Sequence, residues 1–247
     1  MPKPKSQDTR KMVRKTVKKA ELEAFSKGQH YLDMMEEESS SHSQKMLSML
    51  LQAKKAAKTE IFNSFDKKEK DHKKETSKVA LALVFATDLN GEKELFPREK
   101  LFGLLDGLLV LNIKTVVIDT QQPSDLNNLG ELANHKAGQI VWYNPQLDNS
   151  GKAREEKEID RLLLAADLAV VFNHHTDLIK LLMNYGVVIV AEDGSVQLEN
   201  YKPNEETGNA FLFNRRDLWS VFAAVVRALE TFKFPYDWQH IVRKLFR

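Results

Sequence analysis

The chain has 247 residues and no cysteine, which excludes disulfide bonds, thiolate zinc sites and a cysteine nucleophile. Its hydrophobic content of 42% suffices for one α/β domain of ordinary size and an appendage. The net charge of +2 hides an asymmetry, because residues 1–78 hold 19 Lys and Arg against 12 Asp and Glu, whereas residues 79–247 are net acidic. No apolar run approaches the roughly 18 residues of a membrane span, and no apolar N-terminal segment is typical of a secretory signal, so we expect a cytoplasmic protein.

The N-terminal third is predicted to be helical and basic. Residues 9–38 contain no proline and combine a thin apolar stripe with a basic face, and residues 44–66 form a second predicted helix. Residues 67–78 are dense in charge and indicate a linker, so we divide the chain into a basic helical arm, 1–78, and a globular domain, 79–247. The basic face predicts either an arm that docks on an anionic partner or a solvated helix face. The solvated face is favoured, because the arm has no Arg-rich run.

The sequence leaves open how the second helix packs. If it packs on the sheet domain or against the first helix, Met46, Leu50 and Leu51 should be buried. If it projects from the domain, a coiled-coil-like dimer is the alternative, although its apolar stripe is too irregular for clear heptads.

Beyond residue 78, short apolar runs rich in β-branched residues alternate with amphipathic segments. Such runs are typical of strands buried on both faces, and the alternation predicts a doubly wound parallel sheet, a Rossmann-like α/β fold. The predicted strands are residues 79–86, 114–119, 139–143, 167–172, 187–190 and 209–213. The predicted helices are residues 101–111, 129–136, 155–166, 176–185, 216–232 and 237–246.

The clearest unit is the stretch 159–193, which reads as helix, strand, tight turn, helix and strand. Ligands of open α/β sheets bind at the carboxyl ends of strands. A site here would be built from Asn173, His174, His175 and Thr176, with Thr176 as the N-cap of the next helix. Adjacent histidine side chains diverge and no third ligand follows at helical spacing, so a polar turn is favoured over a metal or catalytic site.

A second set of candidate contacts follows the first predicted strand. Asp88, Asn90 and Lys93 stand at its carboxyl end, where they could contact a nucleotide or a sugar, although a plain polar loop is favoured. Asp119 and Thr120 end another strand in the same way. The sequence has no P-loop, no dinucleotide fingerprint, no zinc-protease helix and no nucleophile elbow, so we predict no catalytic residue.

Three aromatic residues at helix positions admit two interpretations. Trp219, Tyr236 and Trp238 could form a carbohydrate-binding platform or pack within the protein. Packing is favoured, because aromatic residues at helical spacing usually face the core.

Four segments, in preserved order, resemble parts of one known domain: LLLAADLAVVF, LLMNYGVVIVAEDGS, TGNAFLFNRRDLWSVFAAVVRALETFKFPYDWQHIVRK and, more weakly, AKKAAKTEIFNSFD. They are similar to segments of the C-terminal, nucleotide-sugar-binding domain of the glycogen synthase and starch synthase family. The resemblance covers roughly residues 53–247 and implies half of a GT-B fold.

The sequence departs from that family where the family holds its donor. The family's G-R-L-x-x-Q-K-G loop, whose Arg and Lys hold the diphosphate, reads FATDLNGEKEL here, with Thr87 at the Arg position and Glu92 at or near the Lys position. Lys93 is one residue off. The family's E-P-C-G-L segment reads FNHHTDLIK, without Glu, Pro or Gly, and Thr176 stands at the helix start. Losing two cations removes the charge-assisted clamp on a departing nucleoside diphosphate.

The resemblance and its departures imply a non-catalytic, glycogen/starch-synthase-like pseudoenzyme that acts as a binding, scaffolding or regulatory module. Its partner would be a protein, an anionic polymer or a second copy, engaged through the N-terminal helices. One alternative is the half of a glycosyltransferase that binds ADP-glucose or UDP-glucose and is completed by another chain. A second is a nucleic-acid-associated protein that acts through the basic arm.

We expect no metal and no cofactor; weak binding of ADP-glucose, UDP-glucose or a nucleoside diphosphate is the alternative. The candidate contact residues for such a ligand are Thr87, Asp88, Asn90, Lys93, His174, His175 and Thr176.

Overall fold

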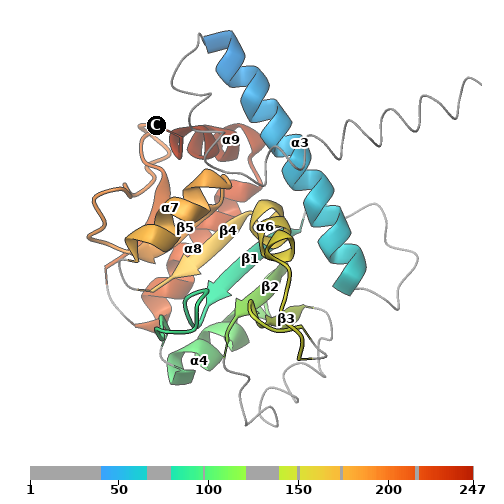
Figure 1. Cartoon of the computed structure of the whole chain (residues 1–247). Coiled ribbons are helices and arrows are strands. Elements are labelled where there is room, and N and C mark those ends of the chain that lie inside the picture. The colour runs from blue at the N-terminus through green and yellow to red at the C-terminus, as the bar shows by residue number, and fades with distance from the viewer. Residues whose placement is uncertain are drawn as a thin grey trace, which may run out of the picture.

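The computed structural model describes residues 40–65, 79–96, 98–120, 139–148, 151–172, 175–214 and 217–246. These residues form a six-stranded, wholly parallel sheet in the order β3-β2-β1-β4-β5-β6, flanked by helices (Figure 1). This architecture confirms the predicted Rossmann-like α/β fold. The strands are β1 Ala80–Phe85, β2 Ile113–Ile118, β3 Ile140–Tyr143, β4 Leu168–Val171, β5 Val188–Glu192 and β6 Ala210–Phe213.

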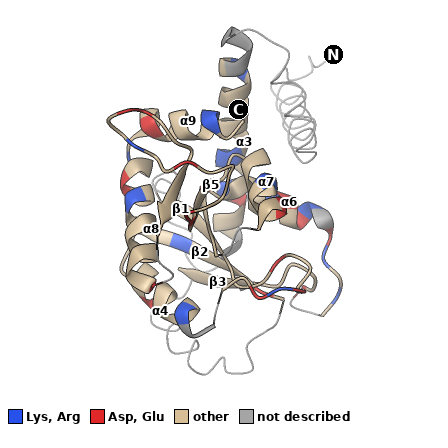
Figure 2. Cartoon of the chain, turned by 90° about the vertical axis from the view of Figure 1, so that its left-hand side faces the viewer, with Lys and Arg blue, Asp and Glu red and all other residues tan. Residues whose placement is uncertain are grey.

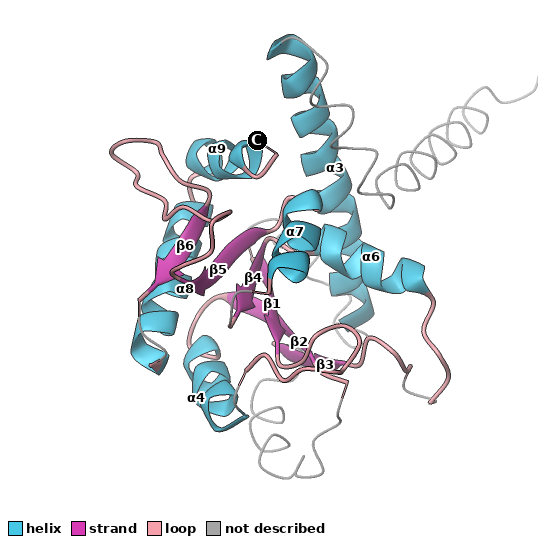
Figure 3. Cartoon of the chain, turned by 60° about the vertical axis from the view of Figure 1, so that its left-hand side comes forward, coloured by secondary structure: helices cyan, strands magenta, loops and turns pink. Residues whose placement is uncertain are grey.

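Helices cover both faces of the sheet (Figure 3). Helix α4 packs against α8 on one face, where a side chain of α8, Leu218, reaches Gly103 of α4. Helices α6 and α7 cover the other face, as right-handed crossovers require. The described helices are α3 Ser40–Phe65, α4 Arg98–Leu108, α6 Glu156–Ala165, α7 Thr176–Asn184, α8 Leu218–Phe232 and α9 Pro235–Lys244. None of them is long and apolar enough to cross a membrane.

Element boundaries differ from the sequence prediction by a few residues. The predicted capping role of Thr176 is wrong: α7 begins at Thr176, and His175 is the N-cap residue, without a side-chain capping bond. Helix α9 begins two residues earlier than predicted because Pro235, with its fixed φ, fits the first helical turn. The predicted helices at 9–38 and 129–136 lie outside the described residues.

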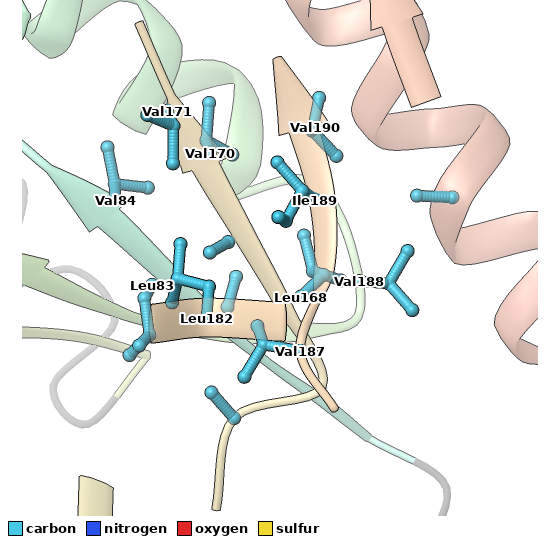
Figure 4. Close-up of a cluster of buried hydrophobic side chains, with 14 of the residues drawn as sticks. Leu83, Val84, Leu168, Val170, Val171, Leu182, Val187, Val188, Ile189 and Val190 are labelled. Atoms are coloured by element: carbon cyan, nitrogen blue, oxygen red, sulfur yellow. The ribbon is translucent and has the colours of Figure 1, made fainter. Parts of the chain in front are cut away.

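The core lies between the central strands and the helices above them. All six residues of β1 are buried, and Leu83 and Val84 of β1 lie in register with Ala169 and Val170 of β4. Figure 4 shows Leu83, Val84 and Val170 beside Leu182 of α7 and the valines of β5. Each fully buried aliphatic side chain contributes about 1.5–3 kcal/mol, so the apolar runs that predicted the strands also stabilise them.

Helix α3 packs on the domain rather than projecting from it. Met46 and Leu50 are buried and Leu51 is half-buried, so the apolar face of α3 joins the same core as the sheet. Figure 1 shows α3 running beside α6 and past α9. The division into an arm, 1–78, and a domain, 79–247, depends on segments outside the described residues and stays a prediction.

Gly186 follows the end of α7, as the sequence predicts. Substitution of this glycine tests the packing between α7 and α3. Its φ of 61° is left-handed, its N–H donates to the Met183 carbonyl, and an added Cβ would lie 2.8 Å from Leu50 Cδ2. We expect Gly186→Ala to lower the free energy of unfolding by about 1–3 kcal/mol, through backbone strain and displacement of Leu50. Urea unfolding measures the change.

The matched control for this substitution is Gly151→Ala. Gly151 also has a positive φ, 78°, but an added Cβ meets nothing within 4 Å. This control should show only the backbone strain of about 1 kcal/mol. Equal losses in the two variants would mean that α3 does not press on the end of α7.

Candidate functional site

The sheet places the described residues of both predicted contact sets at one edge. Strand order reverses direction between β1 and β4, and ligands of open α/β sheets bind outside the carboxyl ends of strands at such a switch point. Strand β1 leads into the loop 86–96. Strand β4 leads through Phe172 to α7, and Asn173 and His174 lie outside the described residues.

The loop after β1 uses its polar groups within the protein. The Thr120 N–H donates to Thr87 Oγ1 at 3.1 Å, and the two threonine hydroxyls lie 3.3 Å apart. Asp88 Oδ1 accepts the backbone N–H groups of Glu92 at 2.8 Å and Lys93 at 3.3 Å. Thr87 and Asp88 are buried, whereas Lys93 is exposed. These bonds give Thr87 and Asp88 roles in holding the loop.

Neighbouring loops are tied to this one. Gln146 Nε2 donates to the Asn90 carbonyl at 2.5 Å, and Asn144 Nδ2 donates to the Thr120 carbonyl at 3.0 Å. Gly91 lies so close to Thr120 that an added Cβ would be 2.4 Å from its hydroxyl oxygen. Hydrogen bonds therefore link the described residues that follow β1, β2 and β3.

Arginine 154 is a cation near this layer, and it is engaged on three sides. Its Nε donates to the Asn144 carbonyl at 2.7 Å, one terminal nitrogen lies 2.7 Å from Glu158 Oε2, and its guanidinium lies 4.2 Å from the Tyr143 ring centroid. Burial raises the pKa of Tyr143 to about 12, and Arg154 opposes this rise. A phosphate would have to compete with these partners for Arg154.

Three phenylalanines occupy the carboxyl edge beside the switch point. We call Phe96, Phe172 and Phe213 the aromatic cluster; all three are buried. The ring centroids of Phe96 and Phe172 are 3.8 Å apart, and those of Phe172 and Phe213 are 5.2 Å apart. The N–H groups of Leu95 and Phe96 donate to the Ala86 carbonyl, which folds the loop back over the end of β1. Apolar rings therefore fill part of the carboxyl edge beside β1, β4 and β6.

The start of α7 carries the remaining candidates. His175 is half-buried, and its Nδ1 has no hydrogen-bond partner among the described residues, while Thr176 is exposed. Asp177 adds a negative charge to the first turn of α7, which disfavours an anion there. Within the described ranges, no group of three or more His, Asp and Glu could hold a metal ion.

Two groups of buried residues were missed by the sequence analysis. One lies at the carboxyl edge of the sheet, and the other lies at the amino edge. The aromatic cluster joins residues far apart in the chain, and only the strand pattern hinted that they share an edge. At the amino edge, Lys54, Lys58 and Asp167 are buried together. The sequence contained one indication of this burial. Two lysines lie on the same face of α3 as the apolar residues Leu50, Ala53 and Ala57.

The packing prediction for three aromatic residues was right for one of them. Trp238 is 5% exposed and packs edge-to-face on Phe232. Trp219 is 81% exposed and Tyr236 is 69% exposed, so the prediction is wrong for both. Each stands near the start of its helix, where the amphipathic pattern constrains the buried face least.

No family model matches the chain, and no curated protein matches it in sequence. Solved structures match it in fold. The catalytic domain of starch synthase IV from Arabidopsis thaliana, bound to ADP and acarbose, matches with a TM-score of 0.58 and 14% identity over 79% of this chain and 39% of that chain. Sucrose-phosphate synthase from Thermosynechococcus elongatus has a TM-score of 0.46 and 12% identity over 69% of this chain and 41% of its own.

A third match is an α,α-trehalose-phosphate synthase from Burkholderia xenovorans, in complex with glucose-6-phosphate. Its TM-score is 0.43, with 13% identity over 76% of this chain and 44% of that chain. The chain thus spans about two-fifths of the length of the enzymes it matches. The likeness to the starch synthase concerns the fold alone: this chain shares the Rossmann-like α/β architecture of part of that catalytic domain.

Proposed function

We propose that the protein is a non-catalytic module, built on a degenerate glycogen/starch-synthase-like domain, that binds or scaffolds a partner. The observation that carries this proposal is the aromatic cluster at the carboxyl edge. Transfer of a sugar from a nucleotide requires cations or N–H donors around the leaving diphosphate. These cations and donors stabilise the diphosphate best when the protein holds them in place before the reaction. The edge instead presents buried phenylalanine rings and loops bonded to one another.

The charged side chains near the edge support the same proposal. Lys93 is exposed, but the neighbouring Glu92 and Glu94 are exposed as well and offset its charge. Arg154 is held by the Asn144 carbonyl and Glu158. Figure 2 shows acidic and basic residues interspersed over the helices of the described domain. A diphosphate would find no concentrated positive field among the described residues of this edge.

A second candidate function is the nucleotide-sugar-binding half of a transferase that another chain completes. The observation that favours it is the switch point, because β1 and β4 bring Lys93, His175 and Thr176 to the edge where α/β sheets bind ligands. The chain also spans about two-fifths of the starch synthase that it resembles. ADP-glucose or UDP-glucose would be the ligand in this case.

The partner of the proposed module would be engaged through the N-terminal helices. A protein, an anionic polymer and a second copy of the chain each fit the basic composition of residues 1–78. If the partner is a nucleic acid, its affinity for the protein should decrease steeply with salt concentration. The binding should be lost when residues 1–38 are deleted.

Assay of sugar transfer tests the proposal. The full chain, incubated with ADP-glucose or UDP-glucose and a glucan acceptor, should release nucleoside diphosphate no faster than the buffer does. An active starch synthase, assayed in parallel, is the positive control for detecting the released nucleoside diphosphate. Release that scales with protein concentration and disappears in Phe172→Arg would overturn the non-catalytic proposal.

A further inference from the structure

Helix α3 brings two lysines to the amino edge of the sheet, where a single carboxylate meets them among the described residues. Lys54, Lys58 and Asp167 are only 5%, 6% and 8% exposed. Lys58 Nζ lies 2.5 Å from Asp167 Oδ2, and that oxygen also accepts the N–H of Leu81 at the start of β1. We call these three side chains the lysine cluster. When both lysines are protonated, the cluster carries a net buried charge of +1.

The second ammonium group is held by backbone dipoles. Lys54 Nζ donates to the Ala166 carbonyl at 2.6 Å and to the Tyr185 carbonyl at 3.0 Å. These carbonyls stand at the C-terminal ends of α6 and α7, where helix dipoles favour a cation. Tyr185 is itself titratable, and its hydroxyl donates to Asp160 of α6. Carbonyls orient Lys54 but carry no full charge, so the excess positive charge of the cluster remains.

Charged and aromatic side chains of other described elements also face this edge. Helix α8 presents the ring of Phe232, 5.0 Å from Lys58 Nζ, and β2 presents Lys114 over the Phe62 ring of α3. The nearest ion pair between α3 and α6 is Glu60 with Arg161, and it is exposed. Lys114 therefore adds a further cation to the surroundings of the cluster.

The imbalance makes packing of α3 depend on pH. Burial lowers the pKa of Lys54 from its ordinary 10.5 to about 7, while Asp167 raises this pKa and Lys58 lowers it. When α3 leaves the domain, Lys54 returns to its ordinary pKa and binds a proton more readily. The packed state therefore gains stability as pH rises from about 7 towards 10.5, and it bears the full cost of the buried charge below that window.

We propose that α3 is an acid-sensitive clamp: protonation of Lys54 loosens α3 from the amino edge. Helix α3 is the first element of the described chain, and it lies outside the sheet beside α6 (Figure 1). It can therefore open without breaking any strand pairing, as local opening of a terminal unit requires. This device is independent of the proposed function at the carboxyl edge.

Hydrogen exchange of the full chain at pH 6 and pH 8 tests the clamp. Backbone amides of residues 47–60 should be about tenfold more protected at pH 8 than at pH 6, after division by the intrinsic exchange rate at each pH. Lys54→Met, which keeps the length of the side chain and removes its charge, should abolish the difference. Lys54→Gln, which retains an uncharged donor, should do the same and covers the case in which the methionine variant does not fold. Lys45→Met, at an exposed position of α3, should keep the difference.

Three results would overturn the proposal. The first is equal protection of α3 at the two pH values in the unmodified chain. The second is a pH dependence that persists in Lys54→Gln. The third is a parallel change in the amides of β1 and β4, which would show that pH acts on the stability of the whole domain and that α3 does not open alone.

Discussion

Replacing Lys58 by methionine should lower the free energy of unfolding by about 3–5 kcal/mol, because the substitution leaves a buried carboxylate without its cation. Lys58 Nζ lies 2.5 Å from Asp167 Oδ2, with both side chains almost fully buried. Asp167 cannot turn to solvent freely, because the Leu81 N–H also donates to it at 2.8 Å. Urea unfolding at pH 8 measures the loss.

Two further variants make the Lys58 experiment specific. Lys58→Met combined with Asp167→Asn should be more stable than Lys58→Met alone, since the double variant removes the orphaned charge. Glu60→Gln breaks the exposed pair with Arg161 on the same helix and should change stability by less than about 1 kcal/mol. A loss below 1 kcal/mol for Lys58→Met would mean that water reaches Asp167 and that α3 does not seal the amino edge.

Replacing Phe172 by alanine should also cost about 3–5 kcal/mol, because it leaves a cavity in a packed aromatic cluster. Phe172 is buried between Phe96 and Phe213, with ring centroids 3.8 Å and 5.2 Å away. Its neighbours come from two other segments of the carboxyl edge and have little freedom to collapse into the space. Thermal or urea unfolding measures the change.

Phe234→Ala is the matched control for Phe172→Ala. Phe234 is 59% exposed, so its truncation should change stability by no more than about 0.5 kcal/mol. A loss below 1 kcal/mol for Phe172→Ala would contradict the account, because it would imply an edge already hollow enough to admit a ligand.

Much of the fold follows from local pattern. The runs 79–86 and 167–172 are largely apolar, and they became adjacent central strands because right-handed crossovers around a parallel sheet leave few arrangements. The sequence left the docking of α3 open, since Lys54 and Lys58 interrupt the apolar stripe and resemble solvent-facing positions. Their partners are carbonyls and Asp167 more than 100 residues away, which no local pattern reveals.

The sequence predicted the location of the candidate site, but it did not predict which side chains would be free to contact a ligand. The alternation of strands and helices located the edge at which Asp88 and His175 lie. It could not show that Asp88 accepts backbone N–H groups of its own loop, because that depends on how the loop folds back. Phe96 lies in a loop, where an isolated aromatic residue carries no periodic signal, so its contact with Phe172 appears only in three dimensions.

The central claim is that the carboxyl edge no longer accepts a nucleotide sugar, and a thermal shift of the full chain tests it most directly. ADP, UDP, ADP-glucose and UDP-glucose, each at millimolar concentration, should leave the melting temperature unchanged. A ligand at 100 times its dissociation constant stabilises the folded state by about 2.7 kcal/mol, roughly 5–10 °C for a chain of this size. A shift of that size with one nucleotide, reduced in Lys93→Glu at an exposed position of the edge, would contradict the claim and favour a sugar-nucleotide-binding half completed by another chain.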